Sequence, residues 1–247
     1  MDSLMVFNTV IYDIQPLAGE RGMVFFAESA DNEESVTSNT EEQILKWILA
    51  HRSLGKFLVS QFFEVPSTVK AYLGLTDPFV ESGRKPGDID LLLIDPAKPD
   101  RSIAFEVKRV KAVATDDEVS RVNGAEKIRK GVIQVNKYQS LGFHQTYLMV
   151  IVLNDARAKR TPNVALRTAN SSNVQRVFGI PWNEPLHADV GIVYVELTQF
   201  TGRAIGQTGS FGVCVDKRAS MLEQATDFTT KIEKLSTQPN RHYMNFN

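Results

Sequence analysis

Residues 87–110 read GDIDLLLIDPAKPDRSIAFEVKRV, and this stretch decides the fold of the chain. It contains two apolar runs, 89–95 and 102–110, with turn-forming residues between them. In the second run apolar positions such as Phe105 and Val107 alternate with charged ones, which is the two-residue period of a strand with one buried face. The short connection between the runs predicts an antiparallel hairpin.

The proline-flanked turn of this hairpin, centred on Lys98, sets the register that we expect. Positions equally distant from the centre pair with each other, which places Asp90 opposite Glu106. The same register places Asp88 opposite Lys108, with facing side chains about 5 Å apart. Two or three carboxylates and one ammonium would then converge on one surface of the sheet.

Carboxylates gathered this closely repel one another, and the arrangement is costly unless a cation joins them. Hard oxygen ligands favour Mg²⁺ or Mn²⁺, and such an ion stabilises the charge on a phosphodiester under attack and lowers the pKa of a bound water. Lys108 would orient that water or stabilise the transition-state anion. The alternative interpretation is a pair of charged strand ends, Asp90 and Glu106, each bridged to a nearby Lys or Arg. Against it stand the apolar neighbours of Asp90, where an unpartnered carboxylate costs several kcal/mol.

Outside the hairpin, periodicity and capping signals predict the remaining elements. Thr40 and Gln43 form a capping box that begins an amphipathic helix, and Gly142 ends another. The predicted helices are 41–53, 124–141, a short one near 171–178, and 219–235. The predicted strands, besides two short ones before residue 28, are 146–154, 189–198 and 210–216. Residues 57–76 are ambiguous between strand and helix, 115–122 read as a loop, and 238–247 as a loose tail.

This order of elements predicts an α/β fold with a mixed β-sheet flanked by helices, and additional N- and C-terminal strands and a C-terminal helix. Because no internal repeat or long linker divides the chain, we expect a single domain over 1–247. Its core is about 40–154. The flanking parts are the N-terminal strands and loop, 1–39, an extension of the sheet plus a helix, 155–237, and the tail, 238–247.

The hairpin also resembles a known family. Gly87-Asp88-Ile89-Asp90 followed by Glu106-Val107-Lys108 resembles the PD-(D/E)xK nuclease signature on its two strands. In the next helix Gln134 and Tyr138 are spaced like the QxxxY motif of the RecB-like and related branches of that superfamily. The resemblance covers roughly 40–154 and implies a restriction-endonuclease-like fold. The proline of the family's first motif is not cleanly matched, because Pro86 precedes Gly87-Asp88 rather than standing directly before Asp90; whether Asp88 or Asp90 is the principal ligand is therefore open.

The resemblance implies roles for individual residues. The implied catalytic residues are Asp90, Glu106, Lys108, Gln134 and Tyr138. The implied ligands of a Mg²⁺ or Mn²⁺ cofactor are Asp90, Glu106 and the carbonyl of Val107, with Asp88 as a further candidate. Many members add a glutamate from the preceding helix, for which Glu41 and Glu42 are both candidates. Gln134 and Tyr138 would support the site or contact the substrate backbone.

The net charge of −1 conceals an uneven distribution. Residues 1–100 carry 8 Lys/Arg and 16 Asp/Glu, whereas 101–176 carry 14 and 6, and 177–247 are close to neutral. A basic segment of this kind suits nucleic-acid phosphates, although a Lys-rich solvated surface gives the same pattern. The residues that we expect to bind nucleic acid are Arg109, Lys111, Lys127, Lys130 and Lys137.

Other classes are disfavoured by the sequence. The longest apolar run, 147–153, is far shorter than the roughly 20 residues that span a bilayer, and the N-terminus does not resemble a signal peptide. The single cysteine, Cys214, cannot form an internal disulfide, which favours the cytoplasm.

Together the residues and the resemblance predict a Mg²⁺-dependent endodeoxyribonuclease that hydrolyses phosphodiester bonds in DNA. Restriction, defence, repair and a mobile element are all suitable settings. One alternative is a nucleic-acid-binding or assembly module of the same fold that has lost turnover, and another is an RNA-directed, toxin-like nuclease. A homodimer or a partner subunit remains open, because no dimer surface can be identified in the sequence.

Overall fold

The computed structural model describes residues 14–17, 21–26, 39–75, 79, 88–113, 121–156, 172–200, 209–239 and 242–244. The strands are β1 (Ile14–Leu17), β2 (Arg21–Phe26), β3 (Lys70–Leu75), β4 (Ile89–Ile94), β5 (Ile103–Val113), β6 (Arg121–Asn123), β7 (Gln145–Ala156), β8 (Gly191–Phe200), β9 (Gly209–Lys217) and β10 (Tyr243–Met244). The α-helices are α1 (Glu41–Ala50), α2 (Arg52–Val59), α3 (Ala125–Gln139), α4 (Ser172–Asn183) and α5 (Thr226–Thr237), with short 3₁₀ turns at Pro66–Thr68 and Pro99–Arg101.

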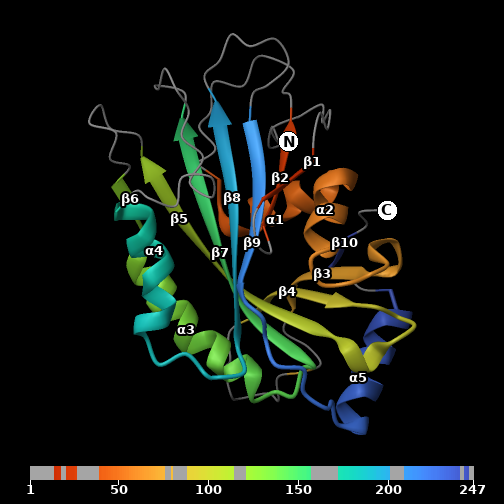
Figure 1. Cartoon of the computed structure of the whole chain (residues 1–247). Coiled ribbons are helices and arrows are strands. Elements are labelled where there is room, and N and C mark those ends of the chain that lie inside the picture. The colour runs from red at the N-terminus through yellow and green to blue at the C-terminus, as the bar shows by residue number, and fades with distance from the viewer. Residues whose placement is uncertain are drawn as a thin grey trace.

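These strands form one mixed sheet in the order β1-β2-β9-β8-β7-β5-β4-β3-β10, with β6 paired to β5. The β5–β7 and β7–β8 pairs are parallel, and the other pairs are antiparallel. Residues of α1 and α2 pack on one face of the sheet, whereas those of α3, α4 and α5 pack on the other (Figure 1). The predicted α/β class, a mixed sheet flanked by helices with added terminal strands and a C-terminal helix, is confirmed.

The hairpin formed by β4 and β5 has the register that the sequence predicts. The paired residues are Leu91 with Phe105, Leu92 with Ala104, and Leu93 with Ile103. All of these side chains are buried, because this hairpin lies near the middle of the sheet. On its other side β5 pairs with β7, the apolar strand expected between two covered faces, and its residues Tyr147–Leu153 are buried.

Helix ends follow the predicted signals in two places and depart from them in one. The Thr40 side chain accepts a hydrogen bond from the Gln43 amide at 3.2 Å, and the Gln43 side chain accepts from the Thr40 amide at 2.7 Å, so the capping box is confirmed. Gly142 follows α3 with φ of +97°, the left-handed conformation that favours glycine. The single helix expected over 41–53 is instead two helices, because His51 adopts an extended backbone between α1 and α2.

Three other expectations are wrong for reasons of tertiary contact. Residues 219–225 do not join α5, since the Leu222 amide donates to the His144 carbonyl at 2.9 Å and so joins this segment to the residue before β7. The tail is not loose throughout, because β10 pairs with β3. The end of the expected loop forms β6 on the edge of β5.

Residues 57–76, for which the sequence does not decide between strand and helix, contain both. They divide into the end of α2, a 3₁₀ turn and β3. Most residues of the first expected N-terminal strand lie outside the described part. In the part that is described, no helix is both long enough and apolar enough to cross a membrane.

Candidate active site

The candidate site lies where β4 and β5 stop pairing. Their ladder extends only as far as Leu91 and Phe105, one position short of Asp90 and Glu106. Beyond that point the Val107 amide donates to the Asp90 carboxylate, Oδ2, at 2.7 Å. The Val107 amide, which would otherwise donate to the backbone of β4, therefore donates to the Asp90 side chain. The end of the β4–β5 pairing leaves space for that carboxylate.

Lys108 connects the two acidic residues that the sequence predicts. Its Nζ forms an ion pair with Glu106 Oε1 and lies 3.8 Å from Asp90 Oδ2. It also donates to the Val107 carbonyl at 3.1 Å. Since one nitrogen atom contacts both carboxylates, the two acidic side chains lie next to each other, as two ligands of a single ion would. The structure therefore brings together Asp90, Glu106, Val107 and Lys108.

The Glu106 carboxylate is the most unusual group of this cluster. Its side chain is 1% exposed, and neither oxygen accepts a hydrogen bond of ordinary geometry from the described residues. Burial and, next, the charge of Asp90 raise the pKa of Glu106 to about 7 against the opposing effect of Lys108. One ammonium thus offsets only part of the cost of burying this carboxylate.

Asp90 and Lys108 are perturbed in the same direction. Burial raises the pKa of Asp90 to about 6, although Lys108 and the Val107 amide both lower it. For Lys108, burial acts to lower the pKa, but Glu106 and then Asp90 outweigh it and hold the pKa above its ordinary value. Lys108 is therefore a persistent cation beside two carboxylates that retain protons more strongly than usual.

The glutamate of the preceding helix is distinguished by the structure. Glu41 begins α1, and its Oε1 accepts a hydrogen bond from the Arg109 amide at 3.1 Å. The same oxygen lies 3.8 Å from Lys127 Nζ. Glu42 is mostly exposed and pairs with Lys46 along the helix. Of the two candidates, Glu41 is at the site and Glu42 is away from it.

Helix α3 contributes the two residues of the QxxxY-like motif in different ways. Tyr138 is buried, and its hydroxyl donates to the backbone carbonyl of Asp88. Burial, and next the charge of Glu106, raises the pKa of Tyr138, which makes the hydroxyl a donor rather than an acid. Gln134 is half-buried, and its side chain makes no hydrogen bond within the described part. The Asp88 side chain is exposed, so this residue contributes its carbonyl to the arrangement.

Gly131 is the residue whose importance the sequence analysis missed. It lies in the middle of α3, and a Cβ built there would be 2.6 Å from Lys108 Cγ and 3.0 Å from Leu148 Cδ1. The absence of a side chain lets the stem of Lys108 lie directly under the helix. A glycine inside a helix costs about 1 kcal/mol of stability relative to alanine, so its presence in a helical pattern indicates that another group packs closely against that position.

We predict that Gly131→Ala lowers the melting temperature and displaces Lys108. The added methyl would overpack the Lys108 stem, which typically costs 1–3 kcal/mol and outweighs the gain in helix propensity. The matched control is Gly179→Ala in α4, where the nearest side-chain atom to the new Cβ would be Asn183 Nδ2 at an ordinary 3.7 Å. Thermal melting of both variants checks this, since an equal rise in both would contradict the packing role.

The predicted nucleic-acid-binding residues occupy the borders of the site. Lys127, Lys130 and Lys137 are exposed on α3, at helical positions that flank the buried line containing Gly131 and Tyr138. Arg109 and Lys111 are half-buried on β5. Two of these residues contact Glu41 Oε1: the Arg109 amide donates to it, and Lys127 Nζ lies 3.8 Å from it.

The donor set can be tested for its fit to a metal ion. No group of three or more His, Cys, Asp or Glu side chains that could hold a metal is found among the described residues. Magnesium, however, is commonly bound by one or two carboxylates and several waters. Asp90, Glu106 and the Val107 carbonyl offer only hard oxygen donors, and Glu106, whose Oε1 is paired with Lys108, has no hydrogen-bond partner of ordinary geometry for Oε2 among the described residues. These residues therefore fit Mg²⁺ or Mn²⁺.

Two comparisons with known proteins bear on this site. No protein-family model matches the sequence, and no curated protein matches it.

Proposed function

We propose that this protein is a metal-dependent nuclease that hydrolyses phosphodiester bonds in DNA. The observation that carries the proposal is the buried Glu106 carboxylate, which lies beside Asp90 and is only partly compensated by Lys108. A pair of acidic groups with raised pKa values, in contact with one lysine, is the kind of perturbed cluster that occurs at functional sites. The proposed family is the PD-(D/E)xK superfamily, on the strength of the sequence motifs.

In this proposal Asp90, Glu106 and the Val107 carbonyl hold Mg²⁺ or Mn²⁺, which would supply charge stabilisation at the scissile phosphate. The Lys108 ammonium donates a hydrogen bond to an oxygen that gains negative charge during the attack of water. Tyr138 fixes the backbone at Asp88, next to the acidic strand. The lysines of α3 attract phosphates without reading the base sequence.

A second function is supported by one observation. The ion pairs of Lys108 with Glu106 and Asp90 partly neutralise the cluster without an ion, as they would in a nucleic-acid-binding or assembly module. Against this, the raised pKa of Glu106 means that Lys108 compensates the buried charge only in part.

RNA is an alternative substrate for the proposed nuclease, because contacts to phosphate alone do not distinguish RNA from DNA.

We predict that metal removal abolishes cleavage. The protein is incubated with plasmid, linear DNA, single-stranded DNA and RNA, in Mg²⁺, in Mn²⁺ and in EDTA. Cleavage of DNA with metal, its loss in EDTA and its recovery when Mg²⁺ is added in excess are the expected results, because the carboxylates alone cannot stabilise an anionic transition state. Cleavage that survives EDTA excludes the mechanism, and no cleavage of any substrate favours the assembly module.

A further inference from the structure

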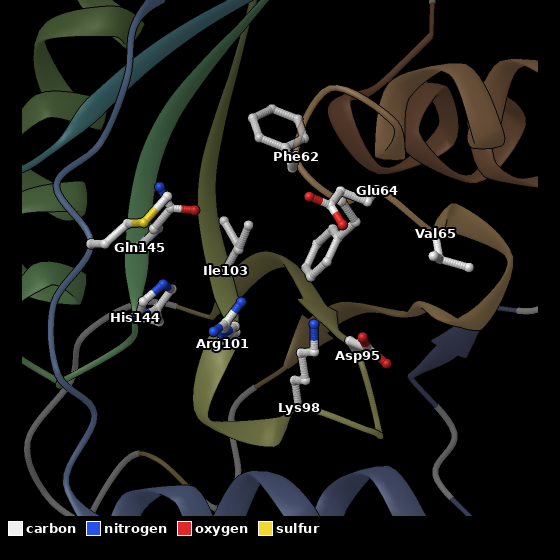
Figure 2. Close-up of a pocket in the computed structure, with 11 residues that line it drawn as sticks. Phe62, Glu64, Val65, Asp95, Lys98, Arg101, Ile103, His144 and Gln145 are labelled. Carbon is white, nitrogen blue, oxygen red and sulfur yellow. The ribbon is translucent and has the colours of Figure 1, made fainter.

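A cavity lies at the opposite end of the β4–β5 hairpin from the candidate active site. It has a volume of about 320 Å³ and is lined by residues from the segment 62–65 after α2, the hairpin turn, the start of β5 and the start of β7 (Figure 2). Ile103, on its wall, has the same strand parity as Phe105 and Val107, whereas Glu106 and Lys108 point to the other face of the sheet. Ile103 also precedes Glu106 by about 10 Å along the strand. This cavity is therefore separate from the candidate active site.

One wall of the cavity carries Gln145, a buried residue whose side-chain oxygen faces the cavity. Gln145 is 7% exposed, and its Nε2 donates to the Ala219 carbonyl at 3.2 Å. That bond fixes the orientation of the amide, since a carbonyl accepts only from the nitrogen. The Oε1 atom accepts no hydrogen bond from the described residues, and Figure 2 shows it pointing toward the cavity. A ligand that fits here must present a hydrogen-bond donor to this oxygen.

The hairpin turn places two cations against the same space. Lys98 and Arg101 line the cavity, and their nitrogens point into it (Figure 2). Neither side chain forms an ion pair with the described residues. Asp95, which also lines the cavity, accepts a hydrogen bond from the Ala97 amide at 3.1 Å and serves the turn. Carboxylates of Asp95 and Glu64 also line the cavity, so the match to an anion is local: a phosphate can contact both cations at once, and the guanidinium fork suits it.

The remaining walls are aromatic and apolar. Phe62, Phe63 and Ile103 line the cavity, and Phe62 is already packed edge-on against Phe105 and Tyr147. Such surfaces accept a flat ring. Ligand cavities commonly range from about 300 to 1,000 Å³, and this one lies at the small end, which favours a mononucleotide over a dinucleotide.

We propose that this cavity binds a nucleoside monophosphate, either free or as the phosphorylated end of a nucleic-acid strand. The ring lies against the aromatic wall and donates to Gln145 Oε1, while the phosphate is bound by Lys98 and Arg101. Glu64, which enters from the opposite side of the cavity in Figure 2, accepts a hydrogen bond from a sugar hydroxyl. Binding at this cavity does not depend on the proposed nuclease activity.

The test is calorimetric titration of the whole chain in EDTA, so that the metal site is not engaged. The ligands are deoxyadenosine monophosphate, deoxyadenosine, deoxyribose 5-phosphate and a short oligonucleotide with a 5′-phosphate. The monophosphate should bind saturably with Kd below about 1 mM, and the two fragments at least about tenfold more weakly, since each lacks one half of the recognition. Tighter binding of the oligonucleotide than of the mononucleotide assigns the strand end as the occupant, and the reverse assigns the free nucleotide.

Variants identify the cavity as the place of binding. Arg101→Gln and Lys98→Gln, both at exposed positions, should each weaken the monophosphate about 10- to 100-fold, the value of a charge-assisted hydrogen bond. Lys231→Gln, an exposed lysine on α5, is the matched control and should change nothing. The proposal is overturned if the monophosphate does not saturate, if deoxyribose 5-phosphate binds equally well, or if neither cavity variant alters the affinity.

Discussion

Replacing Glu106 with glutamine is expected to reduce metal-dependent DNA cleavage by about 10³-fold, while the protein still folds. Glutamine keeps the shape of the buried side chain but removes the charge that would bind the ion. Metal-ion catalysis commonly supplies several kcal/mol, and each 1.36 kcal/mol of barrier changes the rate tenfold. The measurement is the single-turnover cleavage rate in saturating Mg²⁺, together with the shift in melting temperature that Mg²⁺ produces in each protein.

The matched pair Glu41→Gln and Glu42→Gln extends this test to the helix glutamate. Both residues occupy the first turn of α1, but only Glu41 contacts the Arg109 amide and Lys127. Glu41→Gln should therefore slow cleavage, whereas Glu42→Gln should leave the rate unchanged.

If Glu106→Gln retains the wild-type cleavage rate and the wild-type change in melting temperature on adding Mg²⁺, the assigned metal site is wrong.

Replacing Asp90 with asparagine should stabilise the metal-free protein while it abolishes cleavage. Asparagine still accepts the hydrogen bond of the Val107 amide, but it removes a carboxylate that burial and Glu106 both disfavour. The Lys108–Glu106 ion pair remains. We expect the free energy of unfolding in EDTA at pH 8 to rise by about 1–2 kcal/mol, a modest share of the pKa shift because Asp90 is partly exposed.

The sign of this effect determines its pH dependence. Burial raises the pKa of Asp90 from 3.8 to about 6 in the folded protein, so the folded state binds the proton more strongly than the unfolded chain. The wild type is thus stabilised by the protonated carboxyl below about pH 4 and loses this stability as the pH rises through 6. The advantage of Asp90→Asn should be small at pH 4 and complete at pH 8.

Thermal melting in EDTA over this pH range measures the difference. At pH 8 it should amount to about 4 °C in melting temperature for a chain of this size. Asp100→Asn, at an exposed position in the hairpin turn, is the control and should melt like the wild type. A lower melting temperature for Asp90→Asn at pH 8 would mean that Asp90 stabilises the metal-free fold, as a structural ion pair would.

The fold was predictable where local signals and tertiary contacts agree. The turn around Lys98 and the apolar alternation of β5 both specify the hairpin register, and the pairing of Leu91 with Phe105 confirms it. The buried strand β7 was predictable because its continuous apolar run suits the centre of a covered sheet. In these elements the apolar pattern of the sequence agrees with the burial of the side chains in the folded protein.

Prediction failed where distant contacts override local preference. Residues 219–225 have a helical pattern, but the Ala219 carbonyl accepts from Gln145 and the Ser220 amide donates to the Asp189 carbonyl. No local pattern indicates these partners. Likewise β10 exists because the Tyr243 and Met244 backbone meets the open edge of β3, and the free edge could be known only after the strand order.

The candidate site was predictable in its sequence-local part and not in its long-range part. Asp90, Glu106 and Lys108 lie on paired strands, so register alone brings them together. The choice between Glu41 and Glu42 depends on the rotation of α1 relative to β5, and adjacent helical positions point about 100° apart. The meaning of Gly131 similarly depends on how closely α3 approaches Lys108.

The early end of the β4–β5 ladder affects which substitutions the site can tolerate. The Val107 amide and carbonyl serve the site through the main chain, and every amino acid except proline carries both groups. Position 107 can therefore change during evolution among apolar residues of similar volume without loss of those two contacts. Glu106, one residue earlier, has no such freedom, since its contribution resides entirely in its side chain. Libraries saturated at these two positions should retain many residues at one and almost none at the other.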